Sequence, residues 1–418
     1  MNRQSAFDEL MKAKKEMVAG TDLTINITPK KKNKILVPYE FDILKTYIGK
    51  LYGYIQQDTG VHTIIGWEGN EPDLALKAQM IGRVYHTGSN CQRNLFSDMD
   101  EVCIHGNIEN NDTTYYFTHN KNPELNAGQK LKKEIYSITQ DIFSRNTGLL
   151  ETDKMKEKTV LIVGCGSVGS TLALQLTRSG VGRFVLVDTD TIEIHNICRH
   201  QCNLTDVGRF KTDALRDRMI AINPFVTIKC VNNIIQNITT NELDSLLDNQ
   251  SVIVGCGDNR LSDAYSCEEA YTRNIPFISI GFWRRAFVCE IVTCIPQRGD
   301  TCYRCALQDT IEESIKVANQ NRFYVGEEDR AKVAFESGIS VDIDFGTTIG
   351  SKIVLDVLNL NDSNYISKVL HTLTQYTLVC NTNNVKIGGN DALMFSNPLQ
   401  IVRNINFEKG KCKFCRHS

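Results

Sequence analysis

The sequence predicts an α/β fold in which a mainly parallel sheet follows a smaller α+β domain. Three observations predict this fold. An apolar run, a glycine turn and a helical pattern follow one another from Lys158. Apolar runs then alternate with helical patterns as far as Pro296. Residues 1–140 lack that alternation. Repeated strand–helix–strand units give a Rossmann-like parallel sheet with helices on both faces.

The N-terminal domain is predicted over residues 1–140. Apolar residues recur at helical spacing in residues 39–55, which predicts a helix there. Residues 101–121 contain two strand-like runs around "ENND", which predicts a hairpin. We find no catalytic motif in this part of the sequence, and we expect it to recognise the substrate or a partner.

The second domain is predicted over residues 141–418. Its first strands are the apolar runs 160–163 and 184–187, and further strands are predicted in "VTIKCVN", "SVIVGCG", "IPFISIGF" and "AFVCEIVTCIP". Residues 306–333 are polar and acidic, which indicates a mobile or helical connection. A helix is predicted in "TTIGSKIVLDVLNL", and the alternation in residues 365–405 predicts antiparallel strands.

The composition is that of an ordinary globular protein. The 418 residues are long enough for two cores, with 41% hydrophobic and 23% charged residues. A net charge of −2 does not indicate binding to nucleic acid. The basic run 29–34 has no interleaved aromatic residues, so it favours a solvated loop over a nucleic-acid site. We find no apolar stretch near the ~20 residues that span a bilayer, and no secretory signal. We therefore expect a cytoplasmic protein with no membrane or nucleic-acid partner.

A glycine motif opens the second domain. Gly164, Gly166 and Gly169 form G-x-G-x-x-G between a predicted strand and a predicted helix. Such glycines let the backbone turn tightly and approach a phosphate at the helix N-terminus. Asp188 ends the next strand, where a carboxylate accepts hydrogen bonds from ribose hydroxyls. This pattern suits NAD as well as ATP, and a glycine turn without a ligand is the structural alternative.

The residues after this motif favour ATP. Asn196, Arg199 and Lys211 follow in order, and attack on an α-phosphate needs fixed cations that hydride transfer does not. Asp258 and Asn259, in "GCGDN", end another strand, at the edge where ligands bind such a sheet. A carboxylate there can hold Mg²⁺ that bridges the phosphates. The sequence lacks G-x-x-x-x-G-K-[ST], so it is not a P-loop enzyme.

Two cysteine pairs predict a metal site. Cys302 and Cys305 form "CYRC", and Cys412 and Cys415 form "CKFC". Four thiolates make a closed tetrahedral Zn²⁺ site, which is structural because no position is left for water. The long separation suits a site that ties the C-terminal tail to the domain. Two disulfides and an iron–sulfur cluster are the alternatives, and a cytosolic setting disfavours the disulfides.

From about residue 142 to its end, the chain resembles the ThiF/HesA/MoeB adenylating enzymes, a family related to ubiquitin-activating enzymes. The matching motifs, in order, are "FSRN", "GCGSVG", "DTD", "NICRH", "VGRFKTDAL", "GCGDN", "CYRC" and "CKFC". Within this family, the chain most resembles the members that adenylate microcin C-type peptides. The N-terminal domain matches those enzymes by analogy only.

The resemblance implies roles for the predicted residues. The glycine turn and Asp188 hold ATP, and Asp258 holds magnesium. Asn196, Arg199 and Lys211 contact the phosphates. Arg145, in "FSRN", matches a family arginine that reaches into the neighbouring subunit's site. That match implies a homodimer with two composite sites.

The chain departs from many relatives at the cysteine that receives the activated acyl group. Ala334 stands about where that thiol is expected, and no cysteine lies between Cys305 and Cys380. This departure argues against thioester transfer on that loop. The weaker candidates for a reactive thiol are Cys198, Cys202, Cys289 and Cys294.

We therefore expect ATP-dependent adenylation of a C-terminal carboxylate, with release of pyrophosphate. The carboxylate belongs to a ubiquitin-like or sulfur-carrier protein or to a peptide, and the missing loop cysteine favours the peptide. The alternatives are a non-catalytic scaffold, like the inactive half of a heterodimeric activating enzyme, and an NAD-linked oxidoreductase. Intact Arg199, Lys211 and Asp258 argue against the scaffold.

Overall fold

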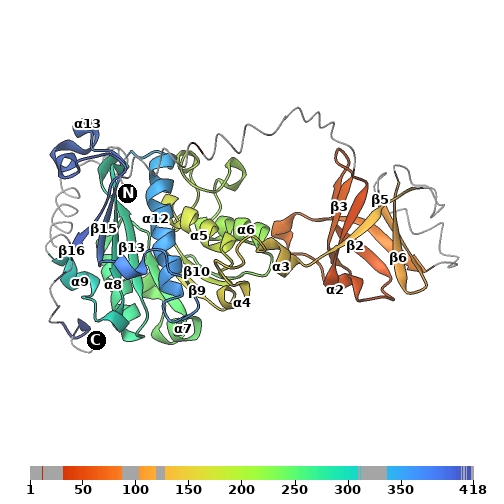
Figure 1. Cartoon of the computed structure of the whole chain (residues 1–418), viewed down its shortest axis with the longest axis horizontal. Coiled ribbons are helices and arrows are strands. Elements are labelled where there is room, and N and C mark those ends of the chain that lie inside the picture. Colours follow the sequence, from red (N-terminus) through yellow and green to blue (C-terminus); the bar gives the residue numbers. More distant parts are fainter. Residues whose placement is uncertain are drawn as a thin grey trace. The chain divides into compact units, whose positions relative to one another are not determined.

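The computed structural model in Figure 1 describes residues 12, 32–86, 103–118, 128–308, 311, 337–405, 407, 410 and 412–415. The chain divides into two compact units, one drawn from Met1–Glu71 and Ala78–Tyr136 and the other from Pro72–Lys77 and Ser137–Ser418. The predicted domain boundary at residue 140 lies just beyond this division. Within the described residues, no helix is long and apolar enough to cross a membrane.

The first unit is one mixed sheet with the strand order β7-β6-β5-β4-β2-β3-β1-β8. The strands are β1 (Lys34–Pro38), β2 (Gly49–Gln56), β3 (Val61–Trp67), β4 (Gln79–His86), β5 (Cys103–Glu109), β6 (Asp112–Thr118), β7 (Gln129–Lys130) and β8 (Lys132–Tyr136). Only Leu131 separates the two outermost strands, and its N–H donates to the Tyr115 carbonyl of β6 at 2.9 Å. Because one segment pairs with both β6 and β1, the sheet closes on itself around a buried apolar core.

The helix predicted over residues 39–55 is wrong. A helix, α2, covers only Tyr39–Asp42, and β2 begins at Gly49. Within β2, Gly53 approaches the next strand so closely that an added Cβ would lie 1.9 Å from the Thr63 carbonyl oxygen. This strand needs glycines for close packing, and glycine weakens a helix.

The predicted hairpin over residues 101–121 is confirmed. Strands β5 and β6 pair antiparallel from Glu109 and Asp112 outward. The two turn residues, Asn110 and Asn111, have φ values of 51° and 61°. Asparagine tolerates this left-handed conformation, which a tight hairpin turn requires at both positions.

The second unit contains a sheet in the order β11-β10-β9-β12-β13-β14-β15-β16. Its strands are β9 (Thr159–Val163), β10 (Arg183–Val187), β11 (Thr227–Val231), β12 (Ser251–Gly255), β13 (Phe277–Phe282), β14 (Val288–Cys294), β15 (Tyr376–Cys380) and β16 (Ile401–Ile405). Strands β11 to β13 in this order are parallel, and β14, β15 and β16 continue the sheet antiparallel. The predicted α/β fold and the antiparallel strands in residues 365–405 are therefore confirmed.

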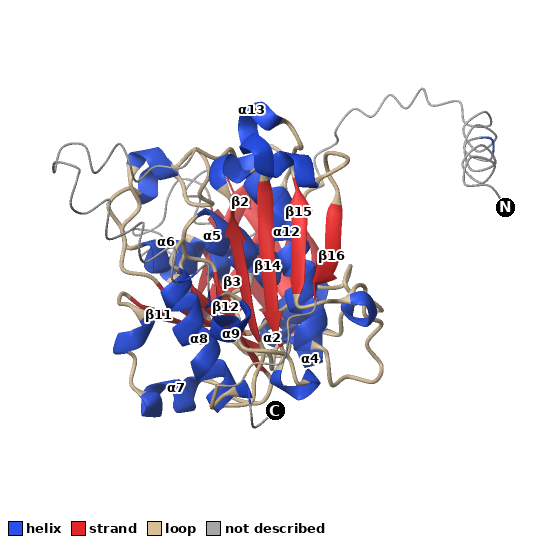
Figure 2. Cartoon of the chain, turned by 90° about the vertical axis from the view of Figure 1, so that its left-hand side faces the viewer, coloured by secondary structure: helices blue, strands red, loops and turns tan. Residues whose placement is uncertain are grey.

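Helices cover both faces of this sheet, as Figure 2 shows. One core cluster includes residues of α5 (Ser167–Arg178), α6 (Lys211–Ile222) and α12 (Ser340–Leu358). The other includes residues of α7 (Thr240–Leu246), α8 (Arg260–Thr272) and α9 (Tyr303–Ala306). The central strands β9 and β12 are buried along their whole length because both of their faces are covered. Helix α12 confirms the predicted late helix, whereas most of the connection predicted over residues 306–333 lies outside the described residues.

Candidate functional site

A cavity of about 520 Å³ lies at the carboxyl ends of β9, β10, β12 and β13. Its lining includes the predicted residues Gly164, Gly166, Asp188, Asn196, Arg199, Lys211 and Asp258. The carboxyl edge of a parallel sheet is the usual place for a ligand. The structure therefore brings seven of the predicted residues to a single cavity, although they are spread over a long stretch of sequence.

The three motif glycines meet different surroundings. Gly164 has φ +92°, and a Cβ there would lie 2.8 Å from the backbone nitrogen of Gly257. A Cβ on Gly169 would lie 1.9 Å from the Gly164 carbonyl oxygen, and Gly169 does not line the cavity. A Cβ on Gly166 would meet nothing within 4 Å. Gly166 precedes the first residue of α5, so the open space lies at a helix N-terminus, where an anion is stabilised.

Asp188 fastens the glycine turn to the end of β10. Its two carboxylate oxygens accept hydrogen bonds from the backbone N–H groups of Cys165 at 2.6 Å and Asp190 at 2.8 Å. On the other side of the turn, His200 Nε2 shares a 2.7 Å hydrogen bond with the Cys165 carbonyl, and burial lowers the pKa of His200. These contacts hold the turn in one shape. Ribose binding by Asp188 stays a prediction.

Lys211 is held at the cavity by a residue that the sequence analysis missed. Its Nζ lies 2.7 Å from a carboxylate oxygen of Asp190. The second acid of the "DTD" motif is the signal that could have identified Asp190. Asn196 ends a 3₁₀ turn, Ile194–Asn196, and its Oδ1 accepts a hydrogen bond from the Glu193 N–H at 2.9 Å. The loop after β10 that carries Asn196 and Arg199 thus contains a 3₁₀ turn with a capped N-terminus.

Besides Gly169, two residues predicted for this site do not line the cavity. Asn259 caps α8, because its Oδ1 accepts hydrogen bonds from the N–H groups of Leu261 at 2.9 Å and Ser262 at 3.3 Å. It therefore fixes the turn that presents Asp258. Arg145 is exposed in the turn after α3 (Ile138–Ile142). Its reach into a neighbouring subunit stays a prediction.

The half of the cavity beyond β12 contains a charged network that the sequence analysis missed. The Arg260 guanidinium lies 2.9 Å from the Glu290 carboxylate. Glu290 also accepts hydrogen bonds from Trp283 Nε1 at 3.0 Å and the Tyr376 hydroxyl at 2.7 Å. Because each of its partners is a donor, the buried Glu290 keeps its charge paired. Glu290 is the one charged residue in the run 287–295, which is the signal that could have identified it.

Asp263 is a second buried acid in this half. It is 4% exposed and accepts a hydrogen bond from the Ser279 hydroxyl at 2.6 Å. Burial raises the pKa of Asp263 to about 7, although the Ser279 hydroxyl and the Arg260 charge act in the opposite direction. This half of the cavity therefore combines a paired cation with a carboxyl group that is partly protonated near neutral pH.

The four predicted metal ligands come together. The sulfur atoms of Cys302, Cys305, Cys412 and Cys415 all lie within 4.8 Å of one another. The distance from Cys302 Sγ to Cys412 Sγ is 3.5 Å. A Zn–S bond of about 2.3 Å gives a sulfur–sulfur separation near 3.8 Å in a tetrahedron, whereas a disulfide is about 2.05 Å long. The arrangement fits zinc and does not fit two disulfides.

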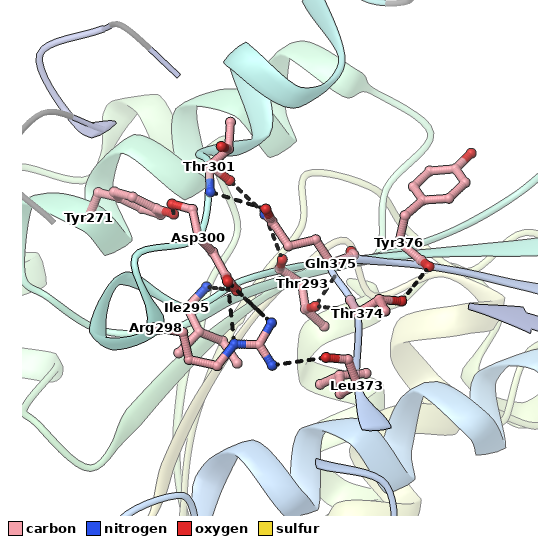
Figure 3. A network of polar contacts seen from close by, with 10 residues as sticks. All are labelled: Tyr271, Thr293, Ile295, Arg298, Asp300, Thr301, Leu373, Thr374, Gln375 and Tyr376. Carbon is pink, nitrogen blue, oxygen red and sulfur yellow. Dashed lines mark hydrogen bonds and ion pairs between the residues drawn. The ribbon is translucent and has the colours of Figure 1, made fainter. Parts of the chain in front are cut away.

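A buried amide holds the segment in front of this cysteine cluster (Figure 3). Gln375 Oε1 accepts a hydrogen bond from the Thr301 N–H at 3.2 Å. Gln375 Nε2 donates to the Thr301 carbonyl at 2.9 Å and to the Thr293 carbonyl at 3.3 Å. Beside it, the Arg298 guanidinium pairs with Asp300 at 2.9 Å. This network fixes the backbone that leads directly into Cys302.

The candidate reactive thiols are mostly inaccessible. Ala334 lies outside the described residues. Cys202, Cys289 and Cys294 are buried, and burial raises the pKa of each of these thiols. Cys198 is exposed, with its Sγ 3.4 Å from the His195 carbonyl oxygen. A nucleophilic thiol needs access and a lowered pKa, so three of these four cysteines are unsuited to that role.

The comparisons with known proteins agree with the motifs. The sequence model of the ThiF family matches residues 139–387. The chain is 28% identical over 174 residues to the molybdopterin-synthase adenylyltransferase of Salmonella typhimurium, which covers 41% of this chain and 68% of that protein. It is 37% identical over 133 residues to ubiquitin-like modifier-activating enzyme 5 of Caenorhabditis elegans. That match covers 28% of this chain and 31% of the nematode protein, so the chain spans less than a third of that relative.

Among solved structures, the chain is similar to Escherichia coli MccB in its crystal structure with AMPCPP and MccA. The identity is 19% and the TM-score 0.48, over 66% of this chain and 74% of that one. A likeness of this size adds nothing on activity to what the cavity itself indicates.

Proposed function

The chain belongs to the ThiF family, and from that premise we propose that it adenylates a carboxyl terminus. The terminal carboxylate of a ubiquitin-like protein, a sulfur-carrier protein or a peptide attacks the α-phosphorus of ATP. One carboxylate oxygen forms the bond to phosphorus, and the bond to the bridging oxygen of the β-phosphate breaks. The products are an acyl-adenylate and pyrophosphate. The names of the relatives, an adenylyltransferase and a modifier-activating enzyme, support this reaction.

One observation carries the proposal. Gly166, with open space at a helix N-terminus, lines the same cavity as Arg199 and Lys211. The N–H groups of a helix N-terminus and two cations stabilise negative charge on a triphosphate, and the same groups stabilise the charge that develops during attack on phosphorus. A site for hydride transfer has no need of two cations beside a helix N-terminus.

Magnesium is part of the proposal. Asp258, at the carboxyl end of β12, is an exposed carboxylate in the cavity lining and supplies an oxygen ligand of the kind that Mg²⁺ prefers. The ion neutralises phosphate charge when ATP is bound. With the ion bound, Asp258 would help to hold the triphosphate in this part of the cavity.

The second half of the cavity receives the acyl substrate. Its walls are apolar at Ile280, Phe282 and Ile343, and Arg260 stands beside them. Apolar walls exclude water, which would otherwise hydrolyse the acyl-adenylate. Arg260 is positioned by Glu290 and attracts the incoming carboxylate.

The cysteine cluster, the oligomeric state and the compartment follow from the same premise. Four thiolates hold a structural zinc ion that ties the C-terminal segment to the domain.

Arg145 completes the cavity of a second subunit, so the protein is a homodimer. The cysteines whose side chains the structure describes are free thiols, and this supports a cytoplasmic protein, because thiols stay reduced in that compartment. No nucleic-acid or membrane partner is proposed.

The test is pyrophosphate exchange into ATP with candidate peptides and small carrier proteins. Exchange that depends on one substrate identifies it. Arg199→Ala and Asp258→Ala should each lower the exchange rate at least about a hundredfold, since each removes stabilisation of phosphate charge. Unchanged exchange in either variant would refute the assignment. Calorimetry adds a control, because tight binding of NAD in place of ATP would favour the oxidoreductase.

A further inference from the structure

Strand β13 has an open position in the second half of the cavity. Gly281 lies one residue before the end of this strand and lines the cavity. Among the residues that the structure describes, and apart from its chain neighbours, none comes within 4 Å of a Cβ built on Gly281. The backbone of Gly281 is not in the left-handed region that favours glycine. The fold itself therefore leaves room for a larger residue at this position.

Glycine is an unfavourable choice within a strand, because it has no side chain to pack. A glycine there often marks a bulge, the close approach of another backbone, or a ligand. The pairing of β13 with β14 shows no register shift between its two ends, Phe277 with Cys294 and Phe282 with Cys289, so these strands contain no bulge. No backbone in the described part of the chain lies within 4 Å of the Cβ position either. Of the three reasons, a ligand is the one that remains.

The open position lies on the polar face of this part of the sheet. Gly281 and Glu290 are direct partners in the antiparallel pair β13–β14, and such partners place their side chains on the same face. Ser279, two residues earlier on β13, lies on this face as well, and its hydroxyl donates to the Asp263 carboxylate of α8 at 2.6 Å. All four residues line the cavity. A group that enters beside Gly281 therefore meets hydrogen-bonding side chains.

The pair between Arg260 and Glu290 supplies donors at this position. Arg260 Nη1 and Nη2 lie 2.9 and 3.3 Å from the two carboxylate oxygens of Glu290, and Nη1 also lies 3.2 Å from the Tyr303 hydroxyl. The Arg260 side chain is 26% exposed, whereas that of Glu290 is 8% exposed. A guanidinium carries five N–H groups, so these contacts leave donors for an oxygen atom of a substrate.

We propose that Gly281 determines which substrates the cavity accepts, because the terminal residue of the acyl substrate occupies the space beside it. This inference rests on the proposed function, since the carboxylate of that residue reacts in the same cavity. Oxygen atoms of the terminal residue accept hydrogen bonds from Arg260. A side chain at position 281 fills the space and excludes the terminal residue, but it leaves the glycine turn and the phosphate-binding residues unchanged.

The test uses stable analogues of the acyl-adenylate, in which a sulfamoyl group replaces the phosphate of adenosine 5′-phosphate. The acyl group is acetyl, N-acetylglycyl or N-acetylalanyl, so the three probes carry the same charge and differ in how much of a terminal residue they contain. Calorimetry with the full chain measures each affinity. We expect the parent protein to bind the N-acetylalanyl probe at least about tenfold more tightly than the acetyl probe, because the added atoms fill the open space.

Substitutions at position 281 should remove this gain in order of size. Gly281→Ala should reduce the gain and Gly281→Val should abolish it, whereas the affinity for Mg-ATP should stay as in the parent protein. Lys229→Val introduces valine at an exposed position of β11, outside the cavity, and should retain the gain. Valine favours strands, so the melting temperature of Gly281→Val should not fall. If that variant does not fold, Gly281→Ala still decides the test.

A gain that survives in both variants at position 281 would overturn the proposal. Equal affinity of the parent protein for all three probes would overturn it as well. In either case, binding of Mg-ATP and of the acetyl probe would leave the proposed function intact. A parent protein that binds neither Mg-ATP nor any probe would instead reject the proposed function, and with it the inference.

Discussion

Gly164, Gly166 and Gly169 belong to one motif, but an added Cβ would not meet the same surroundings at all three. Gly164 and Gly169 are constrained by neighbouring backbone, since a Cβ on either would clash. Gly166 has no neighbour within 4 Å of an added Cβ, so the fold itself leaves room there for a larger residue. The motif therefore contains two residues that the fold requires, and we propose that the third leaves space for a phosphate.

This difference predicts opposite outcomes for two alanine substitutions. Gly166→Ala should leave the free energy of unfolding almost unchanged but weaken ATP binding at least about tenfold, because the methyl group occupies the phosphate space. Gly169→Ala should destabilise the protein by roughly 3 kcal/mol, because the methyl group overlaps the Gly164 carbonyl. Urea unfolding and calorimetry with Mg-ATP measure the two effects. Normal ATP affinity in Gly166→Ala would contradict phosphate binding at this turn.

Asp263 makes stability depend on pH. Burial raises its pKa from 3.8 to about 7, so the folded state binds a proton more tightly than the unfolded state does. The stability that this proton contributes is fully present below pH 3.8 and is lost as the pH rises through about 7. At one pKa unit per 1.36 kcal/mol, the upper limit of this loss is about 4 kcal/mol.

Asp263→Asn tests this pH dependence, because the amide imitates the protonated acid at every pH. The parent protein should lose stability between about pH 5 and about pH 8 relative to Asp263→Asn, as measured by urea unfolding at both values. Asp153→Asn changes an acid whose side chain is 91% exposed and serves as the control. If the two variants respond alike to pH, Asp263 is not the titrating group.

Spacing in the sequence identified the residues of the nucleotide half of the cavity but not those of the other half. Asp188, Lys211 and Asp258 follow strands or open helices, so their order along the chain places them at one edge. Arg260 and Glu290 meet across two strands, and their pairing depends on the order of β12, β13 and β14. A local pattern does not contain that order.

At the scale of elements, apolar periodicity predicted the structure correctly where an element buries one apolar face. Helix α12 has an apolar pattern that the sheet covers, and it was predicted. Strand β2 was mistaken for a helix, since the apolar residues of the segment 39–55 also fit helical spacing. Two glycines, Gly49 and Gly53, favour the strand over the helix. Both glycines approach neighbouring residues closely in the folded protein, and these tertiary contacts outweigh the local helical pattern.

Gln375 links β15 to the cysteine cluster, and its removal should weaken both. Gln375→Met keeps the length of the side chain but leaves the Thr301 N–H and carbonyl without their partner. Each unsatisfied buried group costs about 1–3 kcal/mol, so we expect roughly 3 kcal/mol less stability. The loosened segment leads into Cys302, so zinc should also be lost at a lower chelator concentration. Urea unfolding and metal release to a chromogenic chelator measure the two effects.

Two further variants serve as the negative and the positive control for this measurement. Gln250→Met changes an exposed glutamine and should alter neither stability nor metal release. Cys412→Ser removes a ligand and should abolish zinc binding outright. Parent-like metal release by Gln375→Met would show that the cysteine cluster holds its shape without the amide network.

At the scale of the whole molecule, the first unit was the part that the sequence predicted least. Its β1 pairs with β8 across roughly a hundred residues, and this pairing closes the sheet. The turn residues of a hairpin such as β5–β6 can be identified in the sequence. The closure of the sheet, in contrast, depends on contacts between distant segments. The sequence therefore supports a mixed α+β assignment for this unit and no more detail. Substrate or partner recognition by this unit stays a prediction.

The predicted composite dimer leads to a complementation experiment. Arg145 is exposed and does not line the cavity described above, whereas Asp258 lines it. If Arg145 acts in the neighbouring subunit, Arg145→Ala and Asp258→Ala should each abolish pyrophosphate exchange. Mixing the two inactive proteins then creates heterodimers in which one of the two sites has both residues intact. Random exchange of subunits makes half of the dimers mixed, so about a quarter of the parent activity should return. Activity that stays absent after proven subunit exchange would place Arg145 in its own subunit's site or outside catalysis. Size-exclusion chromatography with light scattering supplies the companion measurement, since a monomeric protein would exclude the composite site altogether.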